Sequence, residues 1–172
     1  PYLSGSGFQA AELPYAGDQV SMVILVPDAG RFEEFQASLD VDRLEQMLAG
    51  LQEVQLQVVF PKVSFTSSYQ LADLLSGMGM PDAFDPVKAD FSRMNPDKSL
   101  FIGQVYHKAF VAVDEKGTEA AAASAVVMME ASAPLEQPQI LIVDRPYIFL
   151  IRHKPSNTIL FMGRVLDPRS DS

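Results

Sequence analysis

The chain contains no cysteine among its 172 residues. That absence excludes disulfide bonds, thiolate nucleophiles and zinc sites built on cysteine, and it leaves the redox compartment undetermined. Cationic residues are also few, since 13 Lys and Arg stand against 22 Asp and Glu, for a formal net charge of −9. A protein of this charge is poorly suited to binding a phosphate backbone, so we expect no nucleic-acid partner.

Membrane-spanning runs and catalytic motifs are missing as well. Hydrophobic residues make up 48% of the chain, but the longest apolar runs, such as residues 147–151, are far too short to span a bilayer. There are two histidines, His107 and His153, and no His-Glu-x-x-His pattern, which argues against a zinc hydrolase. No serine lies in a Gly-x-Ser-x-Gly elbow, and Gly77-Met78-Gly79 lacks the strand and third glycine of a dinucleotide site. We expect no enzyme, no metal, no cofactor and no membrane partner.

Apolar periodicity along the chain predicts an α+β protein. Residues 20–26 are typical of a buried strand, and residues 54–59 alternate apolar with polar side chains. Residues 32–51 have helical spacing that is interrupted near Asp40, which predicts two short helices with a second N-cap there. Residues 69–78 predict a helix ended by glycine. A loop or edge hairpin and a connecting stretch are expected over residues 5–18 and 82–97.

The segment from Asp114 to Ala125 is the most informative part of the chain. It follows residues 105–113, which are rich in the β-branched and aromatic residues of a buried strand. Glu119 falls on the face opposite a row of small or apolar uncharged residues, so this row could enter a sheet without burying a charge. The row is Thr118, Ala120, Ala122, Ser124, Val126 and Met128. Alternatively, residues 119–125 form a helix, because alanine has the highest helix propensity.

Two motifs in the C-terminal third follow in a fixed order: Arg145-Pro146-Tyr147-Ile148-Phe149 and Leu160-Phe161-Met162-Gly163-Arg164. Together with the alanine-rich segment and the strands at Met22–Asp28 and Val59–Phe65, they resemble the serpin family over nearly the whole chain. One departure is Tyr147, where the family usually has Phe. The hydroxyl of Tyr147 should cost little if it reaches water or a carbonyl.

The resemblance implies the serpin fold, with multi-strand mixed sheets and peripheral helices, of which residues 1–172 form the C-terminal portion. Residues 101–114 would then be a central strand of a large mixed sheet. A second sheet would contain residues 20–26, 147–152 and 159–166. A missing N-terminal portion of the same protein would be a partner, and large apolar side chains would be exposed without it. A secreted or extracellular location also follows from the resemblance alone.

The resemblance further implies a reactive-centre loop over about residues 115–138. Its hinge comprises Glu115, Gly117, Thr118, Ala120, Ala121, Ala122 and Ala123. Counting from Glu115 along the family spacing puts the scissile bond between Ala131 and Ser132, and a small residue there suits an elastase- or subtilisin-like protease. A register shifted by two residues would make Met129 the target residue and favour a chymotrypsin-like protease.

Two further residues have roles implied by the resemblance. Lys62 and Glu115 would form an ion pair at the base of the hinge; alternatively they are solvated surface charges, whose pairing contributes only about 0–1 kcal/mol. His107 would lie where the central sheet opens and hydrogen-bond across strands, a conformational role rather than a catalytic one. The alternative is an ordinary structural histidine.

The resemblance to serpins implies a serine-protease inhibitor that acts as a suicide substrate. The protease would form a covalent acyl-enzyme with the loop, and the cleaved loop would insert into the central sheet as a conformational change. A non-inhibitory serpin that acts as a carrier or chaperone-like binding protein is the alternative within the family. An α+β interaction domain with an alanine helix is the alternative outside it. The uncharged, proline-free hinge favours the inhibitor.

Overall fold

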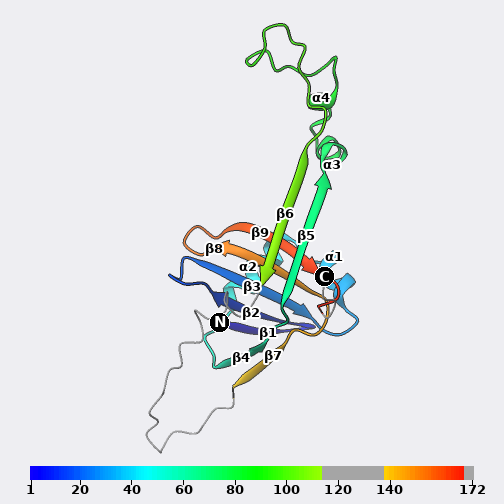
Figure 1. Ribbon diagram of the computed structural model, residues 1–172. Helices are drawn as coiled ribbons and strands as arrows, with labels where there is room; N and C mark the ends of the chain where they lie inside the picture. Colours follow the sequence, from blue (N-terminus) through cyan, green and yellow to red (C-terminus); the bar gives the residue numbers. More distant parts are fainter. Residues whose placement is uncertain (114–137, 169–172) are drawn as a thin grey trace, which may run out of the picture. The chain divides into compact units, whose positions relative to one another are not determined.

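The computed structural model describes residues 1–113 and 138–168 (Figure 1). The chain divides into two compact units: one contains residues 1–63 and the chain from Val113 onward, and the other contains residues 64–112. We describe each unit by itself. The predicted hinge and scissile bond lie outside the described residues.

The first unit is built on a five-stranded antiparallel sheet with the order β1-β2-β3-β8-β9. The strands are β1 (Tyr2–Gly5), β2 (Phe8–Pro14), β3 (Val20–Pro27), β8 (Tyr147–His153) and β9 (Thr158–Val165). The three strands predicted to share a sheet, β3, β8 and β9, are confirmed as neighbours. The N-terminal stretch forms the edge hairpin β1–β2 rather than an irregular loop.

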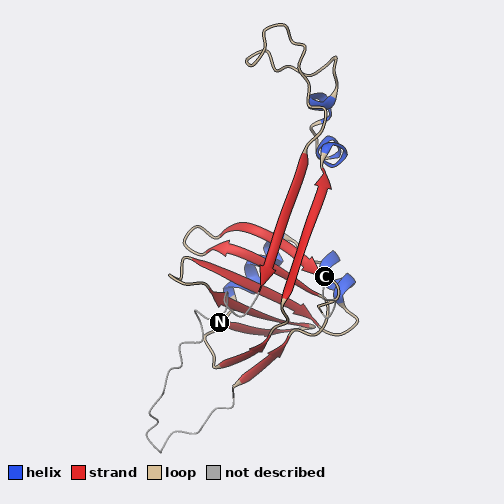
Figure 2. Cartoon of the chain, viewed as in Figure 1, coloured by secondary structure: helices blue, strands red, loops and turns tan. Residues whose placement is uncertain are grey.

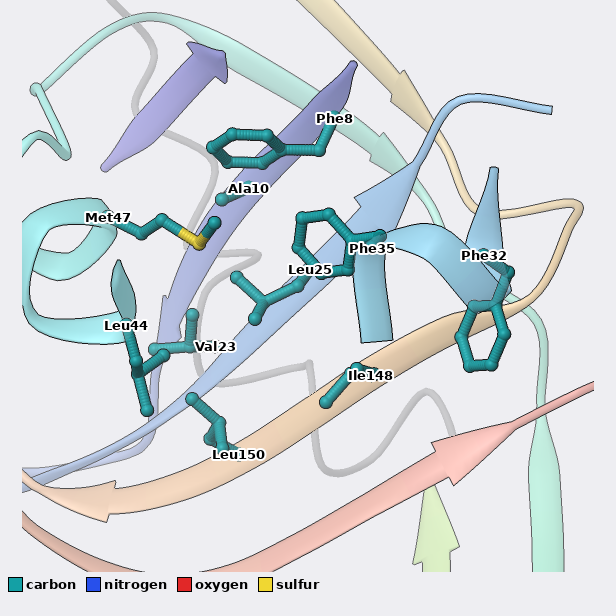
Figure 3. Packing of buried hydrophobic residues seen from close by; sticks show 10 residues of the cluster. All are labelled: Phe8, Ala10, Val23, Leu25, Phe32, Phe35, Leu44, Met47, Ile148 and Leu150. Atoms are coloured by element: carbon teal, nitrogen blue, oxygen red, sulfur yellow. The ribbon is translucent and has the colours of Figure 1, made fainter. Parts of the chain in front are cut away.

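Helices α1 (Phe32–Ala37) and α2 (Val41–Ala49) pack their apolar side chains onto this sheet. Asp40 caps α2 by accepting a hydrogen bond from the Arg43 backbone nitrogen at 2.8 Å, which confirms the predicted break between two short helices. Figure 3 shows side chains from both helices meeting those of β2, β3 and β8. This core consists of Phe8, Ala10, Val23, Leu25, Phe32, Phe35, Leu44, Met47, Ile148 and Leu150.

A small parallel pair of strands, β4 (Leu56–Val59) and β7 (Gln139–Ile142), completes the first unit. Leu56 lies opposite Gln139, and Val59 lies opposite Ile142. Backbone hydrogen bonds continue past both ends of the ladder, from Gln139 to Gln55 at 2.8 Å and from Val143 to Val59 at 2.9 Å. A strand was expected near residues 54–59, but periodicity could not name its partner.

The second unit contains β5 (Val63–Gln70) and β6 (Tyr106–Val113), which pair with their arrows in opposite directions (Figure 2). Between them lie α3 (Ala72–Gly77) and α4 (Pro81–Phe84). The helix expected from residue 69 begins later, because Tyr69 and Gln70 still belong to β5. A backbone hydrogen bond from Leu71 to Val105, at 2.8 Å, marks the change from strand to helix.

The predicted central strand over residues 101–114 is confirmed as a strand only over β6, and its sheet differs from the expectation. Among the described residues that sheet has two strands, not the many of a large mixed sheet. Two strands cannot cover their own apolar side chains. Tyr106 is accordingly 74% exposed and Phe110 64% exposed.

Candidate functional site

The candidate site is the connection between β6 and β7. β6 ends at Val113, the last described residue before the predicted loop, and β7 begins at Gln139, just beyond it. The predicted loop residues lie in the undescribed range, so their roles stay predictions. They are Glu115, Gly117, Thr118, Ala120, Ala121, Ala122, Ala123, Ala131 and Ser132. The structure defines the elements at both ends of this connection.

The C-terminal end of the connection is firmly anchored. β7 lies in the parallel ladder with β4, and its Leu141 side chain is completely buried. Ile140 and Ile142, on the other face of β7, are about half exposed. This alternation follows from the two-residue period of a strand, and it leaves one face of β7 in the core and the other uncovered.

His107 lies in β6, next to β5, where the structure places it against Tyr69. The two rings stack with centroids 6.4 Å apart and planes inclined by 21°. His107 therefore does face a neighbouring strand, but the contact is a ring stack between two exposed side chains. The predicted hydrogen bond across strands stays a prediction, and nothing in the sequence pattern singled out Tyr69 as the neighbour.

Lys62 lies in the short connection between β4 and β5, with an exposed side chain. Its predicted partner, Glu115, lies outside the described residues, so the proposed ion pair is not tested. His153 is half-buried, and its Nδ1 lies 2.7 Å from the Ser156 hydroxyl in the turn between β8 and β9.

A buried charged network, which sequence reasoning missed, ties the central strands of the first unit together. Glu12 is only 6% exposed. Its Oε1 accepts hydrogen bonds from the Ser21 hydroxyl at 2.6 Å and from Arg152 Nε and Nη2 at 3.0 and 2.7 Å. Arg152 Nη1 also donates to Asn157 at 2.7 Å. The network therefore links β2, β3, β8 and the turn that follows β8.

These hydrogen bonds decide the charge state of Glu12. Burial by itself raises the pKa of Glu12, but the hydrogen bonds from Ser21 and Arg152 outweigh it, and the pKa is lowered. A signal was available in the sequence: Glu12 and Arg152 are charged residues in strands that are mostly apolar. A charge at such a position usually has a buried partner.

The Tyr147 hydroxyl does not meet the condition under which it should cost little. The residue is 1% exposed, and within residues 1–113 and 138–168 the hydroxyl has no hydrogen-bond partner. The ring packs edge-on against Phe60, with centroids 5.5 Å apart. Burial raises the pKa of Tyr147 to about 12. The position provides an apolar pocket, which suits the Phe that the family usually has.

The described residues contain no cluster of three or more His, Asp or Glu side chains placed to hold a metal ion. No helix in the described part is long and apolar enough to cross a membrane.

Comparison with known proteins identifies the chain's relatives. The profile of the family described as "Serpin (serine protease inhibitor)" matches residues 2–168. An uncharacterised serpin-like protein of Thermococcus kodakarensis is 41% identical, with 98% of this chain and 39% of the relative covered. The leukocyte elastase inhibitor of Xenopus laevis is 35% identical, with 97% of this chain and 45% of the relative covered.

A solved structure agrees with these sequence relatives. The native state of tengpin, a thermophilic serpin, superimposes with a TM-score of 0.78 at 29% identity, covering 96% of this chain and 43% of tengpin. The chain thus spans about two fifths of the length of the relatives it matches. Its sheets and helices form part of the serpin fold, and the chain belongs to the serpin family.

Proposed function

We propose that the complete protein inhibits a serine protease as a suicide substrate, through a reactive-centre loop at about residues 115–138. The observation that carries this proposal is a row of small uncharged residues at alternate positions, Thr118, Ala120 and Ala122, in the sequence that follows β6. Membership of a family described by serine-protease inhibition supports it. So does a relative that bears the name of an elastase inhibitor.

The proposed reaction begins at the Ala131 carbonyl. The protease's serine oxygen attacks the carbonyl carbon, the peptide bond to Ser132 breaks, and the leaving amine takes the proton that the serine gave up. The product is an ester between Ala131 and the protease. The small Ala131 side chain fits the shallow pocket of an elastase- or subtilisin-like enzyme.

Insertion of the cleaved hinge beside β6 then outruns hydrolysis of the ester. Each new backbone hydrogen bond contributes only about 0.5–1.5 kcal/mol net, but a whole strand of such bonds drives a large rearrangement. Val126 and Met128 add apolar burial. Lys62 and Glu115 hold the base of the hinge in register.

We further propose that an N-terminal portion of the same protein supplies the missing neighbours of the described strands. Tyr106 and Phe110 on β6, and Phe161 and Met162 on β9, are large apolar side chains about half exposed or more. Exposed apolar surface of this kind normally marks an interface. Mass spectrometry of the intact purified protein tests this by showing whether a second chain segment accompanies this one.

The test of inhibition uses the complete protein with an elastase-like protease. Denaturing electrophoresis should show a stable one-to-one adduct, and mass spectrometry should place the ester at Ala131. Thr118→Arg puts a charge on the inserting face, which costs several kcal/mol when the charge is buried unpaired. The variant should then be cleaved at the same bond without trapping the protease.

Glu119→Arg is the matched control, because in an inserted strand residue 119 would lie on the face opposite Thr118. It should trap the protease as the parent does. Equal trapping by the Thr118→Arg variant would exclude insertion as the mechanism. Cleavage of the parent without any adduct would instead favour a non-inhibitory carrier or chaperone-like role.

A further inference from the structure

A pocket with two arginines lies in the first unit, on the helical side of the five-stranded sheet. It has a volume of about 110 Å³. It is lined by Ser6 and Gly7 from the β1–β2 turn, by Arg31, Glu34, Phe35 and Ser38 in and around α1, and by Arg43 of α2. The predicted reactive loop contributes none of these residues.

Arg31 is held in the pocket by a carboxylate and by a turn that leaves room for it. Its Nε and Nη2 donate to both oxygens of Glu34, at 2.9 to 3.1 Å. Its Nη1 is not used by Glu34 and lies against Gly7, where an added Cβ would come within 2.9 Å of it. Gly7 also has a φ of +83°, a conformation that favours glycine. The Nε and Nη2 edge of the Arg31 guanidinium is therefore bonded to Glu34, and Nη1 faces the β1–β2 turn.

Arg43 reaches the same pocket from the other helix. Its guanidinium lies over the Phe35 ring, with Cζ 5.0 Å from the centroid. Its Nη1 donates to the Ser38 hydroxyl and to the Ser38 carbonyl. Across the described part of the chain, Nε and Nη2 of Arg43 have no hydrogen-bond partner.

The lining of this pocket has more cationic than anionic side chains. Two guanidinium groups face one lining carboxylate, Glu34, in a chain whose net charge is −9, and the Asp28 carboxylate also attracts Arg31 from outside the lining. The Glu34 carboxylate already accepts hydrogen bonds from Arg31, and these bonds lower the pKa of Glu34. Within residues 1–113 and 138–168, no acceptor is paired with the remaining N–H groups of Arg31 and Arg43 or with the Ser6 hydroxyl.

We propose that this pocket binds a tetrahedral oxyanion, the phosphate group, between Arg31 and Arg43. Guanidinium groups pair with phosphate through parallel N–H donors, and they keep their charge at every physiological pH. The volume accommodates one such group, either as the free ion or as the end of a small phosphate monoester. The negative charge of the rest of the chain repels anions at long range, so we expect millimolar affinity.

The test is thermal unfolding of the protein in inorganic phosphate, with chloride adjusted to keep ionic strength constant. Binding should raise the melting temperature by about 4 °C at a phosphate concentration about tenfold above Kd. For Arg43→Gln, the melting temperature in phosphate should equal the melting temperature of the same variant without phosphate. Arg93→Gln, which changes an exposed arginine in the other unit, should keep it, and it controls for the general stabilising effect of phosphate.

Glu34→Gln gives a prediction of the opposite sign. Removing the competing carboxylate frees Arg31, and phosphate should then bind about fivefold more tightly. Line broadening of the phosphorus-31 resonance measures the affinity without relying on unfolding. A parallel titration with glycerol phosphate supports a monoester ligand if it binds as well as inorganic phosphate, and a free-ion site if it does not bind. Equal responses of the parent and Arg43→Gln, or weaker binding by Glu34→Gln, would overturn the proposal.

Discussion

Replacing Tyr147 by Phe should stabilise the protein. The Tyr147 hydroxyl is buried and, among the described residues, has no hydrogen-bond partner, and an unpaired buried polar group costs about 1–3 kcal/mol. Phe keeps the ring and its edge-on contact with Phe60. The free energy of unfolding should therefore rise by about 1–3 kcal/mol, and a gain of 2 kcal/mol would raise the melting temperature by about 4–8 °C.

The pH dependence of stability gives a second measure of the same hydroxyl. The folded pKa of Tyr147, about 12, lies above the ordinary value of 10.0. The protonated hydroxyl is thus favoured by the fold, so this contribution is complete below pH 10 and is lost as the pH rises toward 12. The Tyr147→Phe variant should lose less stability than the parent across that interval.

Urea unfolding followed by far-ultraviolet circular dichroism is the appropriate assay, because the chain has no tryptophan to report by fluorescence. Tyr106→Phe is the matched control: Tyr106 is 74% exposed, so its change should stay within about 0.5 kcal/mol. If Tyr147→Phe instead destabilises the protein by about 1 kcal/mol or more, the hydroxyl has a partner, and the reasoning fails.

Two further predictions concern the first unit. Glu12→Ala leaves the Arg152 charge buried without its partner and should cost about 3–5 kcal/mol, with the double Glu12→Ala, Arg152→Ala variant losing less than the sum. Because the pKa of Glu12 lies below its ordinary 4.5, this stabilisation is present above that pH and is lost as acid titrates through the lowered value, which acid unfolding of parent and variant measures. Gly163→Ala places a Cβ 2.5 Å from the Phe149 ring and should destabilise the protein by about 1–3 kcal/mol in urea. Gly103→Ala, where a Cβ meets nothing within 4 Å, should be close to neutral; similar losses in both glycine variants would argue against the close contact.

Much of the fold could be predicted from local sequence patterns. The apolar runs of β3 and β8 and the Asp40 cap between α1 and α2 follow from side-chain periodicity and capping chemistry, which act over a few residues. The predicted ends of the elements were less accurate. Tyr69 was predicted to begin a helix, but it lies near the end of β5. Pairing with β6 extends β5 to Gln70, and a local pattern does not include the neighbouring strand.

The sequence predicts where the candidate site lies, but it does not give the geometry of that site. Small uncharged residues at alternate positions after β6, together with the resemblance to serpins, predict the hinge, because a face that enters a sheet should not bury an unpaired charge. The ring stack of His107 on Tyr69 joins two strands that are distant in sequence. No spacing rule predicts which residue of one strand lies beside a given residue of another.

By itself, the sequence determined the α+β class and the order of most elements, and it predicts where the hinge lies. Each of these depends on composition or on contacts between near neighbours in the chain. Only the tertiary structure decided that β4 pairs in parallel with β7, that Glu12 meets Arg152, and that the Tyr147 hydroxyl is buried. The two-residue period of a strand determines which side chains share a face, but the packing of distant segments decides what that face touches.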